Sequence, residues 1–191
     1  MPVRAAFLVG FMASGKSSVG QELARRLNWD FVDLDLRIQT REGQTVAEIF
    51  RDQGESGFRL AEHAALLDLT EALDRDTVVA LGGGAFAHSK NRELLRAWHS
   101  VFLETPLDEL WKRCMEDSTE RPLRKDPAEF ARLYESRLPF YRQATVTVVT
   151  SGKDPVSLCA EIERTLQFRG ETEGEGSSQT SPAHFGTGES Q

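Results

Sequence analysis

Residues near the amino terminus match a phosphate-binding loop at every constrained position. The stretch Gly10-Phe11-Met12-Ala13-Ser14-Gly15-Lys16-Ser17 fits the pattern G-x-x-x-x-G-K-[ST]. Its glycines let backbone N–H groups approach phosphate oxygens without a Cβ in the way. Lys16 can reach the β- and γ-phosphates of a nucleotide, and the Ser17 hydroxyl can ligate Mg²⁺. These residues predict that the chain binds a nucleoside triphosphate.

The residues around this loop favour the same interpretation. The apolar run 5–9 predicts a short buried strand before the loop, and residues 18–27 predict a helix after it. Such a helix would point its positive end at a bound phosphate. A glycine-rich turn that matches the pattern by chance would not need this strand and helix.

Two carboxylates follow the next predicted strand, residues 31–33. Ligands of an open parallel sheet bind beyond the carboxyl ends of its strands. In an extended segment Asp33 and Asp35 share a face, so we expect both to face the phosphate loop. One could hold Mg²⁺ through water, and the other could accept a hydrogen bond from a substrate hydroxyl and take its proton. The alternative is a solvated acidic loop.

Two arginines are candidates for binding anionic groups. Arg59 is predicted to lie in a turn before a helix over 62–73, and its planar fork suits a carboxylate or a phosphate. A surface salt bridge to Glu62 is the alternative for Arg59. Arg121 lies in the polar stretch 116–126, which could close over the phosphates as a lid and exclude water. The alternative for that stretch is a plain surface loop.

Three consecutive glycines, Gly82, Gly83 and Gly84, follow the apolar run 77–81. They would offer bare backbone to a ligand, although a merely flexible loop is the alternative. Farther along the chain, Arg137 and Tyr141 lie four residues apart, on one face of a predicted helix.

Short strand-like segments alternate with longer helical ones along the chain. This order predicts an α/β fold with a parallel sheet. We expect Pro139 to bend or end its helix, and Asp154 to cap the final one. The predicted strands are 5–9, 31–33, 77–81, 101–103 and 145–149; the predicted helices are 18–27, 46–52, 62–73, 89–97, 128–141, one opening at Pro106 and one after Asp154.

Composition and length suit one ordinary domain over residues 1–169. Residues 170–191 are rich in Gly, Ser, Thr, Glu and Gln, and predict a disordered acidic tail. The net charge is −7, and four glutamates of the tail account for four of these charges, which leaves the folded part near −3. This balance does not favour nucleic acid as the main partner. No apolar run is long enough to span a membrane, and no signal peptide precedes the first strand. With two isolated cysteines, these features predict a cytoplasmic protein.

Together these motifs resemble the shikimate kinase family, from about Val3 to Leu166. The resemblance implies a three-layer P-loop fold with a five-stranded parallel sheet, strand order 2-3-1-4-5, and a mobile lid. The matching pieces, besides the phosphate loop, are Phe31-Val32-Asp33-Leu34-Asp35, Ala47-Glu48-Ile49-Phe50, Gly54-Glu55, Phe58-Arg59-Leu60-Ala61-Glu62, Gly82-Gly83-Gly84, Arg121-Pro122-Leu123 and Arg137-Leu138-Pro139-Phe140-Tyr141.

The family transfers the γ-phosphate of ATP to the 3-hydroxyl of shikimate with Mg²⁺, giving shikimate 3-phosphate and ADP. This reaction is a step toward chorismate and the aromatic amino acids. By resemblance we expect the same activity here, with ATP, Mg²⁺ and shikimate as the small-molecule partners. We expect a monomer, because no exposed apolar stripe demands a partner.

The resemblance also implies roles for individual residues. Catalysis would rest on Lys16, Asp35 and Arg121, and Mg²⁺ would be held by Ser17 and by Asp33 through water. Arg59 and Arg137 would clamp the shikimate carboxylate, while Asp35 and Gly82, Gly83 and Gly84 would complete that pocket. Nucleotide binding would use Gly10, Met12, Ala13, Ser14, Gly15, Lys16, Ser17, Ser18, Arg113 and Arg121.

The sequence departs from the family pattern in the predicted lid. Arg124 stands where the family commonly has leucine, and the spacing from Arg113 to Arg121 is one residue longer than usual. Both departures concern lid geometry and nucleotide affinity rather than the reaction. Two other functions remain open at this point: a gluconate-type small-molecule kinase, and a catalytically idle nucleotide-binding module.

Overall fold

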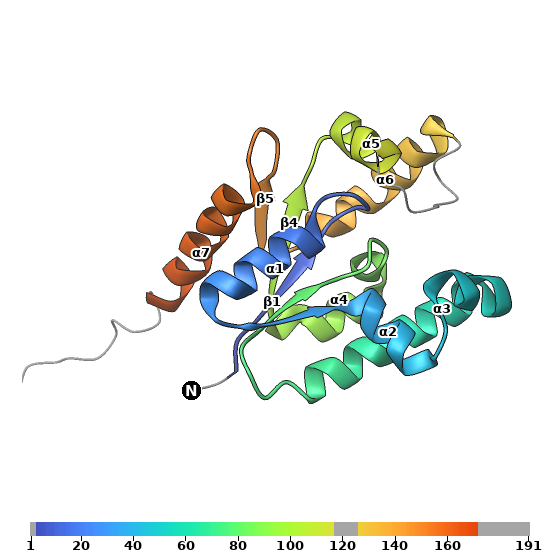
Figure 1. The fold of residues 1–191 in the computed structure, drawn as a ribbon, viewed down its shortest axis with the longest axis horizontal. Coiled ribbons are helices and arrows are strands. Elements are labelled where there is room, and N and C mark those ends of the chain that lie inside the picture. The colour runs from blue at the N-terminus through green and yellow to red at the C-terminus, as the bar shows by residue number, and fades with distance from the viewer. Residues whose placement is uncertain (1–2, 117–125, 172–191) are drawn as a thin grey trace, which may run out of the picture.

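A five-stranded parallel sheet forms the centre of the protein, with helices on both of its faces (Figure 1). The computed structural model describes residues 3–116 and 126–171, with side chains described up to Leu166. The strands lie in the order β2-β3-β1-β4-β5, so the predicted sheet and its order are confirmed. Their bounds are β1 (Ala5–Val9), β2 (Asp30–Asp33), β3 (Thr77–Ala80), β4 (His99–Glu104) and β5 (Val146–Val149).

Polar caps define where several helices begin. Thr45 and Glu48 form a reciprocal capping box at the start of α3. Asp154 Oδ1 accepts a hydrogen bond from Ser157 N at 2.9 Å, which confirms the predicted cap of the last helix. The helices are α1 (Lys16–Leu27), α2 (Leu34–Glu42), α3 (Val46–Glu71), α4 (Ser89–Leu94), α5 (Leu107–Glu116), α6 (Pro127–Tyr141) and α7 (Pro155–Glu171), with 3-10 turns η1 (Ala85–Ala87) and η2 (Leu95–Ala97).

The helical structure differs from the prediction at α2 and α3, and the predicted helix 89–97 is α4 followed by the 3-10 turn η2. Helix α2 was not expected; it forms because Asp33 caps its first turn and because Leu34 and Ile38 are buried. The predicted helices 46–52 and 62–73 belong to one long element, α3, which is interrupted at Gly54 (φ 68°). Helix α6 reaches Tyr141, as the predicted range 128–141 has it, so Pro139 does not end the helix.

Alternate residues of the central strands pack into two separate cores. Leu8, Val78 and Val101 contribute to the core that α1 and α7 cover. Phe7, Val79 and Phe102 point to the opposite face, where α2, α3, α5 and α6 supply the packing residues. Burial on both faces explains why these strands read as continuous apolar runs in the sequence.

Some predicted features fall outside the described residues. The lid residues Arg121 and Arg124 are among them, as is the predicted tail from residue 172 onward. Helix α7 itself extends to Glu171. Within the described ranges, no helix combines the length and apolar character needed to cross a membrane.

Gly20 provides a test of how closely α1 packs on the sheet. Exchanging glycine for alanine inside a helix normally stabilises a protein by about 0.5–1 kcal/mol. At Gly20, however, a Cβ would lie 2.6 Å from Phe31 Cε2 and 3.2 Å from Leu8 Cδ1. We therefore expect Gly20→Ala to lower the free energy of unfolding in urea by about 1–3 kcal/mol.

Gln21→Ala, at an exposed position of the same helix, is the control and should change stability little. A Gly20→Ala protein as stable as the wild type would contradict the close packing.

Candidate active site

The phosphate loop connects β1 to α1 and depends on unusual backbone conformations. Gly10 and Gly15 have φ values of 152° and 90°, and Ala13 has a left-handed φ of 62°. A Cβ on Gly10 would lie 2.8 Å from Ser14 Oγ and 3.1 Å from the Leu103 carbonyl oxygen. The loop can close in this form only because Gly10 has no side chain.

Lys16 folds back over its own loop. Its Nζ donates hydrogen bonds to the carbonyl oxygens of Gly10 at 2.9 Å and Phe11 at 2.7 Å. The ammonium group therefore lies directly over the loop. To bind phosphate oxygens it would exchange these backbone contacts for stronger, charge-assisted ones.

Ser17 and Asp33, the two residues predicted to hold the metal, lie in contact. Ser17 Oγ donates to Asp33 Oδ2 at 2.8 Å, although the two residues come from different elements. Mg²⁺ in nucleotide sites takes few protein ligands and keeps several waters and phosphate oxygens. A hydroxyl and a carboxylate at this distance fit that pattern. Elsewhere in the described residues no group of three or more His, Cys, Asp or Glu side chains could hold a metal ion.

Asp35 lies in a helix rather than in the extended segment that we expected. Asp33 Oδ1 accepts hydrogen bonds from the N–H groups of Asp35 and Leu36, at 3.0 and 3.4 Å, and so starts α2. Asp35 is therefore directed by a helical turn, not by strand alternation. Its Oδ1 would lie 2.6 Å from a Cβ on Gly82, so it reaches the glycine loop after β3.

Arg59 lies within α3, not in a turn before a helix, and it makes the salt bridge named as its alternative. Its Nη1 lies 2.9 Å from Glu62 Oε2, and its Nη2 lies 3.3 Å from Glu55 Oε1. Glu62 is fully buried, whereas Glu55 is 69% exposed. The pair with Glu62 is thus an internal contact that orients the guanidinium, and the pair with Glu55 is open to exchange.

The carboxyl of Glu62, the buried partner of this arginine, has a shifted pKa. Burial raises the pKa of its carboxyl, and the Asp35 carboxylate adds to that effect. Arg59 acts in the opposite direction by favouring the charged form. Arg137 acts in the same direction as Arg59. Both carboxylates lie near Gly82, because a Cβ there would be 2.6 Å from Asp35 Oδ1 and 3.4 Å from Glu62 Oε1.

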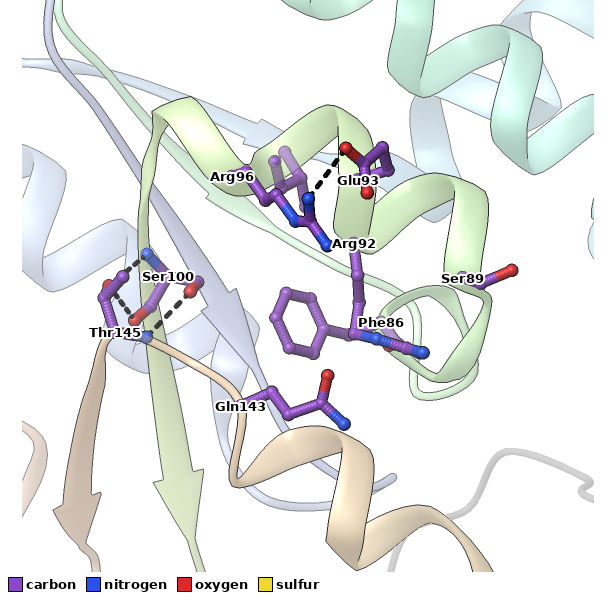
Figure 2. A pocket seen from close by; sticks show the side chains of 9 residues that line it. Phe86, Ser89, Arg92, Glu93, Arg96, Ser100, Gln143 and Thr145 are labelled. Carbon is purple, nitrogen blue, oxygen red and sulfur yellow. Dashed lines mark hydrogen bonds and ion pairs between the residues drawn. The ribbon is translucent and has the colours of Figure 1, made fainter.

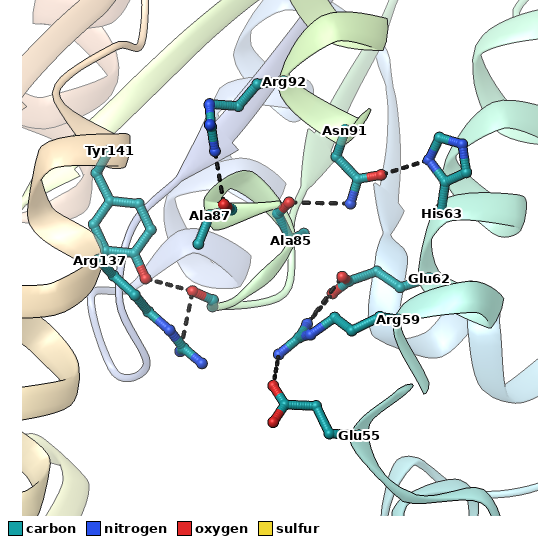
Figure 3. A network of polar contacts seen from close by, with 11 residues as sticks. Glu55, Arg59, Glu62, His63, Ala85, Ala87, Asn91, Arg92, Arg137 and Tyr141 are labelled. Atoms are coloured by element: carbon teal, nitrogen blue, oxygen red, sulfur yellow. Dashed lines mark hydrogen bonds and ion pairs between the residues drawn. The ribbon is translucent and has the colours of Figure 1, made fainter. Parts of the chain in front are cut away.

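The backbone from Gly82 to Ala87, which we call the glycine turn, is held by side chains from two helices, α4 and α6 (Figure 3). Asn91 Nδ2 donates to the Ala85 carbonyl oxygen at 3.0 Å, and Asn91 Oδ1 lies 2.7 Å from His63 Nδ1. Arg92 Nη1 donates to the carbonyl oxygens of Phe86 at 2.9 Å and Ala87 at 2.7 Å. The turn is therefore well ordered, and the flexible-loop alternative does not apply.

Arg137 and Tyr141 hold the other side of the glycine turn. Arg137 Nη1 and the Tyr141 hydroxyl both donate to the Gly83 carbonyl oxygen. Tyr141 is buried, and burial raises its pKa to about 12, so it remains a donor at neutral pH. In Figure 3 the guanidinium groups of Arg59 and Arg137 point toward the same side of the turn.

Glycine is required where this turn meets its neighbours. A Cβ on Gly84 would overlap the Arg59 guanidinium, and one on Gly83 would lie 3.3 Å from the Met12 N atom of the phosphate loop. The structure therefore brings Arg59, Arg137 and Asp35 around one turn that also touches the phosphate loop.

Two predicted nucleotide residues lie away from this cluster in the described structure. Arg113 sits in the last turn of α5 and pairs with Glu109 at 3.0 Å. Ser18 is exposed in the first turn of α1. Arg121 lies outside the described residues.

Several residues of the site had no assigned role in the sequence analysis. Glu62 was considered only as a surface partner, although a glutamate three residues after an arginine is a recognisable helical pair. Tyr141 was placed on the face of Arg137 without a function. Asn91 and Arg92 donate to backbone carbonyl groups, and His63 contacts the Asn91 side chain; their residue types alone give no such signal.

The sheet order and the phosphate loop define this protein as a P-loop kinase of the small-molecule type. A family model for shikimate kinase matches residues 12–167. The shikimate kinase of Persephonella marina is 38% identical over 161 residues, which are 84% of this chain and 97% of that protein. The chain belongs to the shikimate kinase family.

Solved structures agree with this assignment. Shikimate kinase from Acinetobacter baumannii in complex with shikimate is 34% identical with a TM-score of 0.80, covering 87% of this chain and 94% of that one. Shikimate kinase from Aquifex aeolicus is 36% identical with a TM-score of 0.77, covering 87% and 98%. A gluconokinase from Sinorhizobium meliloti, 20% identical with a TM-score of 0.54, shares the fold alone.

The hydrogen bond from Tyr141 to the glycine turn has a measurable consequence for stability. We expect Tyr141→Phe to lower the free energy of unfolding by about 1–2 kcal/mol, because a buried carbonyl group loses one of its donors. Urea unfolding followed by circular dichroism would measure this loss.

Tyr134→Phe is a matched control. Tyr134 is also largely buried, but its hydroxyl makes only a long bond of 3.4 Å to the Thr105 carbonyl oxygen. Its removal should cost less than that of the Tyr141 hydroxyl. Equal losses in the two variants would argue against a special role for Tyr141.

Proposed function

We propose that this protein transfers the γ-phosphoryl group of ATP to the 3-hydroxyl of shikimate, giving shikimate 3-phosphate and ADP. The observation that carries the proposal is the glycine turn, which adjoins Arg59, Arg137 and Asp35 and also contacts the phosphate loop. An acceptor with one carboxylate and several hydroxyls needs such a set of groups next to a phosphate donor. The A. baumannii relative solved with shikimate supports the choice of acceptor.

Two arginines would bind the acceptor carboxylate. Arg137 offers guanidinium N–H groups beside the Gly83 carbonyl group. Arg59 is oriented by the buried Glu62, and a substrate carboxylate would take the place that the exposed Glu55 holds on its Nη2. Because Glu55 is mostly in water, this exchange costs little.

Asp35 would bind the acceptor hydroxyls and receive the proton of the attacking one. Its position at Gly82 places it beside the same turn as the arginines. The loop backbone from Gly10 to Ser18 and Lys16 would hold the ATP phosphates, with Arg113 on the nucleotide side and Arg121 contacting the phosphates from the lid. These assignments rest on the family motifs and on the contacts described above.

Ser17 and Asp33 would hold Mg²⁺, Asp33 through a water molecule. The bound ion would neutralise charge on the β- and γ-phosphates. We further propose that the protein acts as a monomer in the cytoplasm, on the way to chorismate and the aromatic amino acids, and needs neither nucleic acid nor a membrane.

The reaction is tested by measuring ADP release in the presence of ATP and Mg²⁺. Three assays are compared: one with shikimate, one with gluconate and one with no acceptor. We expect release only with shikimate, and Lys16→Ala should abolish it because the ammonium group that binds the phosphates is lost. Lys90→Ala, an exposed lysine on α4, is the control. ATP binding without shikimate-dependent release would favour an idle nucleotide-binding module.

Arg137→Ala should weaken shikimate binding by about 2–5 kcal/mol, because the substrate carboxylate loses a charged partner. Calorimetric titration of the folded variant with shikimate would measure this change. Arg142→Ala removes an exposed arginine from the end of the same helix and should leave the affinity unchanged. Normal shikimate affinity in Arg137→Ala would exclude the proposed clamp.

We also propose that residues 1–169 form the kinase domain and that the acidic tail contributes nothing to it. A chain that ends at Glu171 should keep its turnover rate and its melting temperature. A loss of either on removing residues 172–191 would show that the tail is structural.

A further inference from the structure

A cavity of about 270 Å³ lies at the amino-terminal end of the sheet (Figure 2). Ser100, the second residue of β4, and Thr145, just before β5, form part of its wall. The phosphate loop follows the carboxyl end of β1, which runs parallel to β4. The part of the cavity formed by Ser100 and Thr145 therefore lies at the end of the sheet away from the phosphate loop, while Phe86 of the glycine turn lines another part of it.

The lining of this cavity combines positive charge with an apolar wall. Arg92 and Arg96 lie in it with one acidic residue, Glu93, which pairs with Arg96 at 3.0 Å. The buried side chains of Phe86 and Leu95 supply the apolar part. Such a combination suits a small organic anion with a carboxylate and a ring or short apolar body.

The polar wall of the cavity is rigid. Ser100 and Thr145 exchange three hydrogen bonds, of 2.8, 3.0 and 2.8 Å, that join β4 to the start of β5. Gln143 lies beside them, and in Figure 2 its side chain faces those of Phe86 and Arg92. These bonds fix the positions of the Ser100 and Thr145 side chains in the wall.

Arg92 lines the cavity and also donates hydrogen bonds to the glycine turn. Its hydrogen bonds to Phe86 and Ala87 use Nη1 alone, and its guanidinium also lies 4.6 Å from the Phe140 ring centroid. Within the described residues, its Nε and Nη2 make no hydrogen bond. These N–H groups suit a carboxylate. If a bound carboxylate moved the guanidinium, the hydrogen bonds from Nη1 to the Phe86 and Ala87 carbonyl groups would weaken.

We propose that this cavity is a second binding site, for a small organic carboxylate, and that it is coupled through Arg92 to the glycine turn. A ligand that shifts the Arg92 guanidinium weakens its hydrogen bonds to Phe86 and Ala87. The glycine turn, which Arg59 and Arg137 contact, is then less well fixed. Binding at the two sites is then mutually weakening, by the same factor in each direction. The existence of the site is independent of the proposed function, whereas the coupling to shikimate rests on it.

The probe for the site is 4-hydroxybenzoate, which carries a carboxylate, a ring and a hydroxyl. We expect calorimetric titration of the full chain to detect binding at millimolar concentrations, and the neutral 4-hydroxybenzamide not to bind. Arg96→Glu, at the exposed rim, should weaken binding of the probe by about fivefold while leaving turnover without the probe unchanged. Arg25→Glu reverses the charge of an equally exposed arginine on α1 and should have no effect.

Coupling is measured by titrating shikimate at rising concentrations of the probe. We expect the shikimate dissociation constant to rise to a plateau about fivefold higher, because a complex with both ligands forms. A rise without a plateau would mean direct competition in the active site and would overturn the proposal. Absence of probe binding, or equal binding by the Arg96→Glu variant, would overturn the second site itself, even if shikimate turnover is normal.

Discussion

The glycine turn imposes the constraint on which the proposed active site depends. Even with the 3-10 turn η1 at its end, this segment has carbonyl groups that must find side-chain donors inside the protein. Arg137 and Tyr141 serve Gly83, Asn91 serves Ala85, and Arg92 serves Phe86 and Ala87. The need to satisfy these groups therefore fixes the position of Arg137 as well, so one set of hydrogen bonds both stabilises the turn and shapes the pocket.

Charge balance is the second determinant of the site. Glu62 is fully buried, and its cost of desolvation is offset by Arg59, which must stay near it. Arg59 in turn contacts Gly84 so closely that a Cβ there would displace its guanidinium. The buried Glu62 carboxylate thus orients Arg59 through Nη1 and leaves Nη2 for an exchangeable partner, which is the exposed Glu55 in this structure. The same arginine could not be oriented as well by exposed residues, because surface ion pairs are weak.

Much of the fold and part of the site could be predicted from the sequence. The phosphate loop is contiguous, so its residues are placed by local backbone geometry. Ser17 also lies in contact with Asp33, whereas the metal site itself stays a prediction. Continuous apolar runs predicted the buried strands, and Asp154 predicted a helix start. Helix α2 was not predicted because its main signal is Asp33. That residue ends strand β2, and its side chain caps the helix that follows directly.

The sequence by itself determined the phosphate loop, the alternation of strands and helices, and the residue types available for an anionic acceptor. These features depend on neighbouring residues, so local rules are enough to predict them. Only the tertiary structure decided that the buried Glu62 orients Arg59 and that Asp35 reaches Gly82 from a helix. It also decided that Arg137 and Tyr141 both donate to the Gly83 carbonyl group. These contacts join distant segments of the chain, and packing of the helices against the sheet is what brings those segments together.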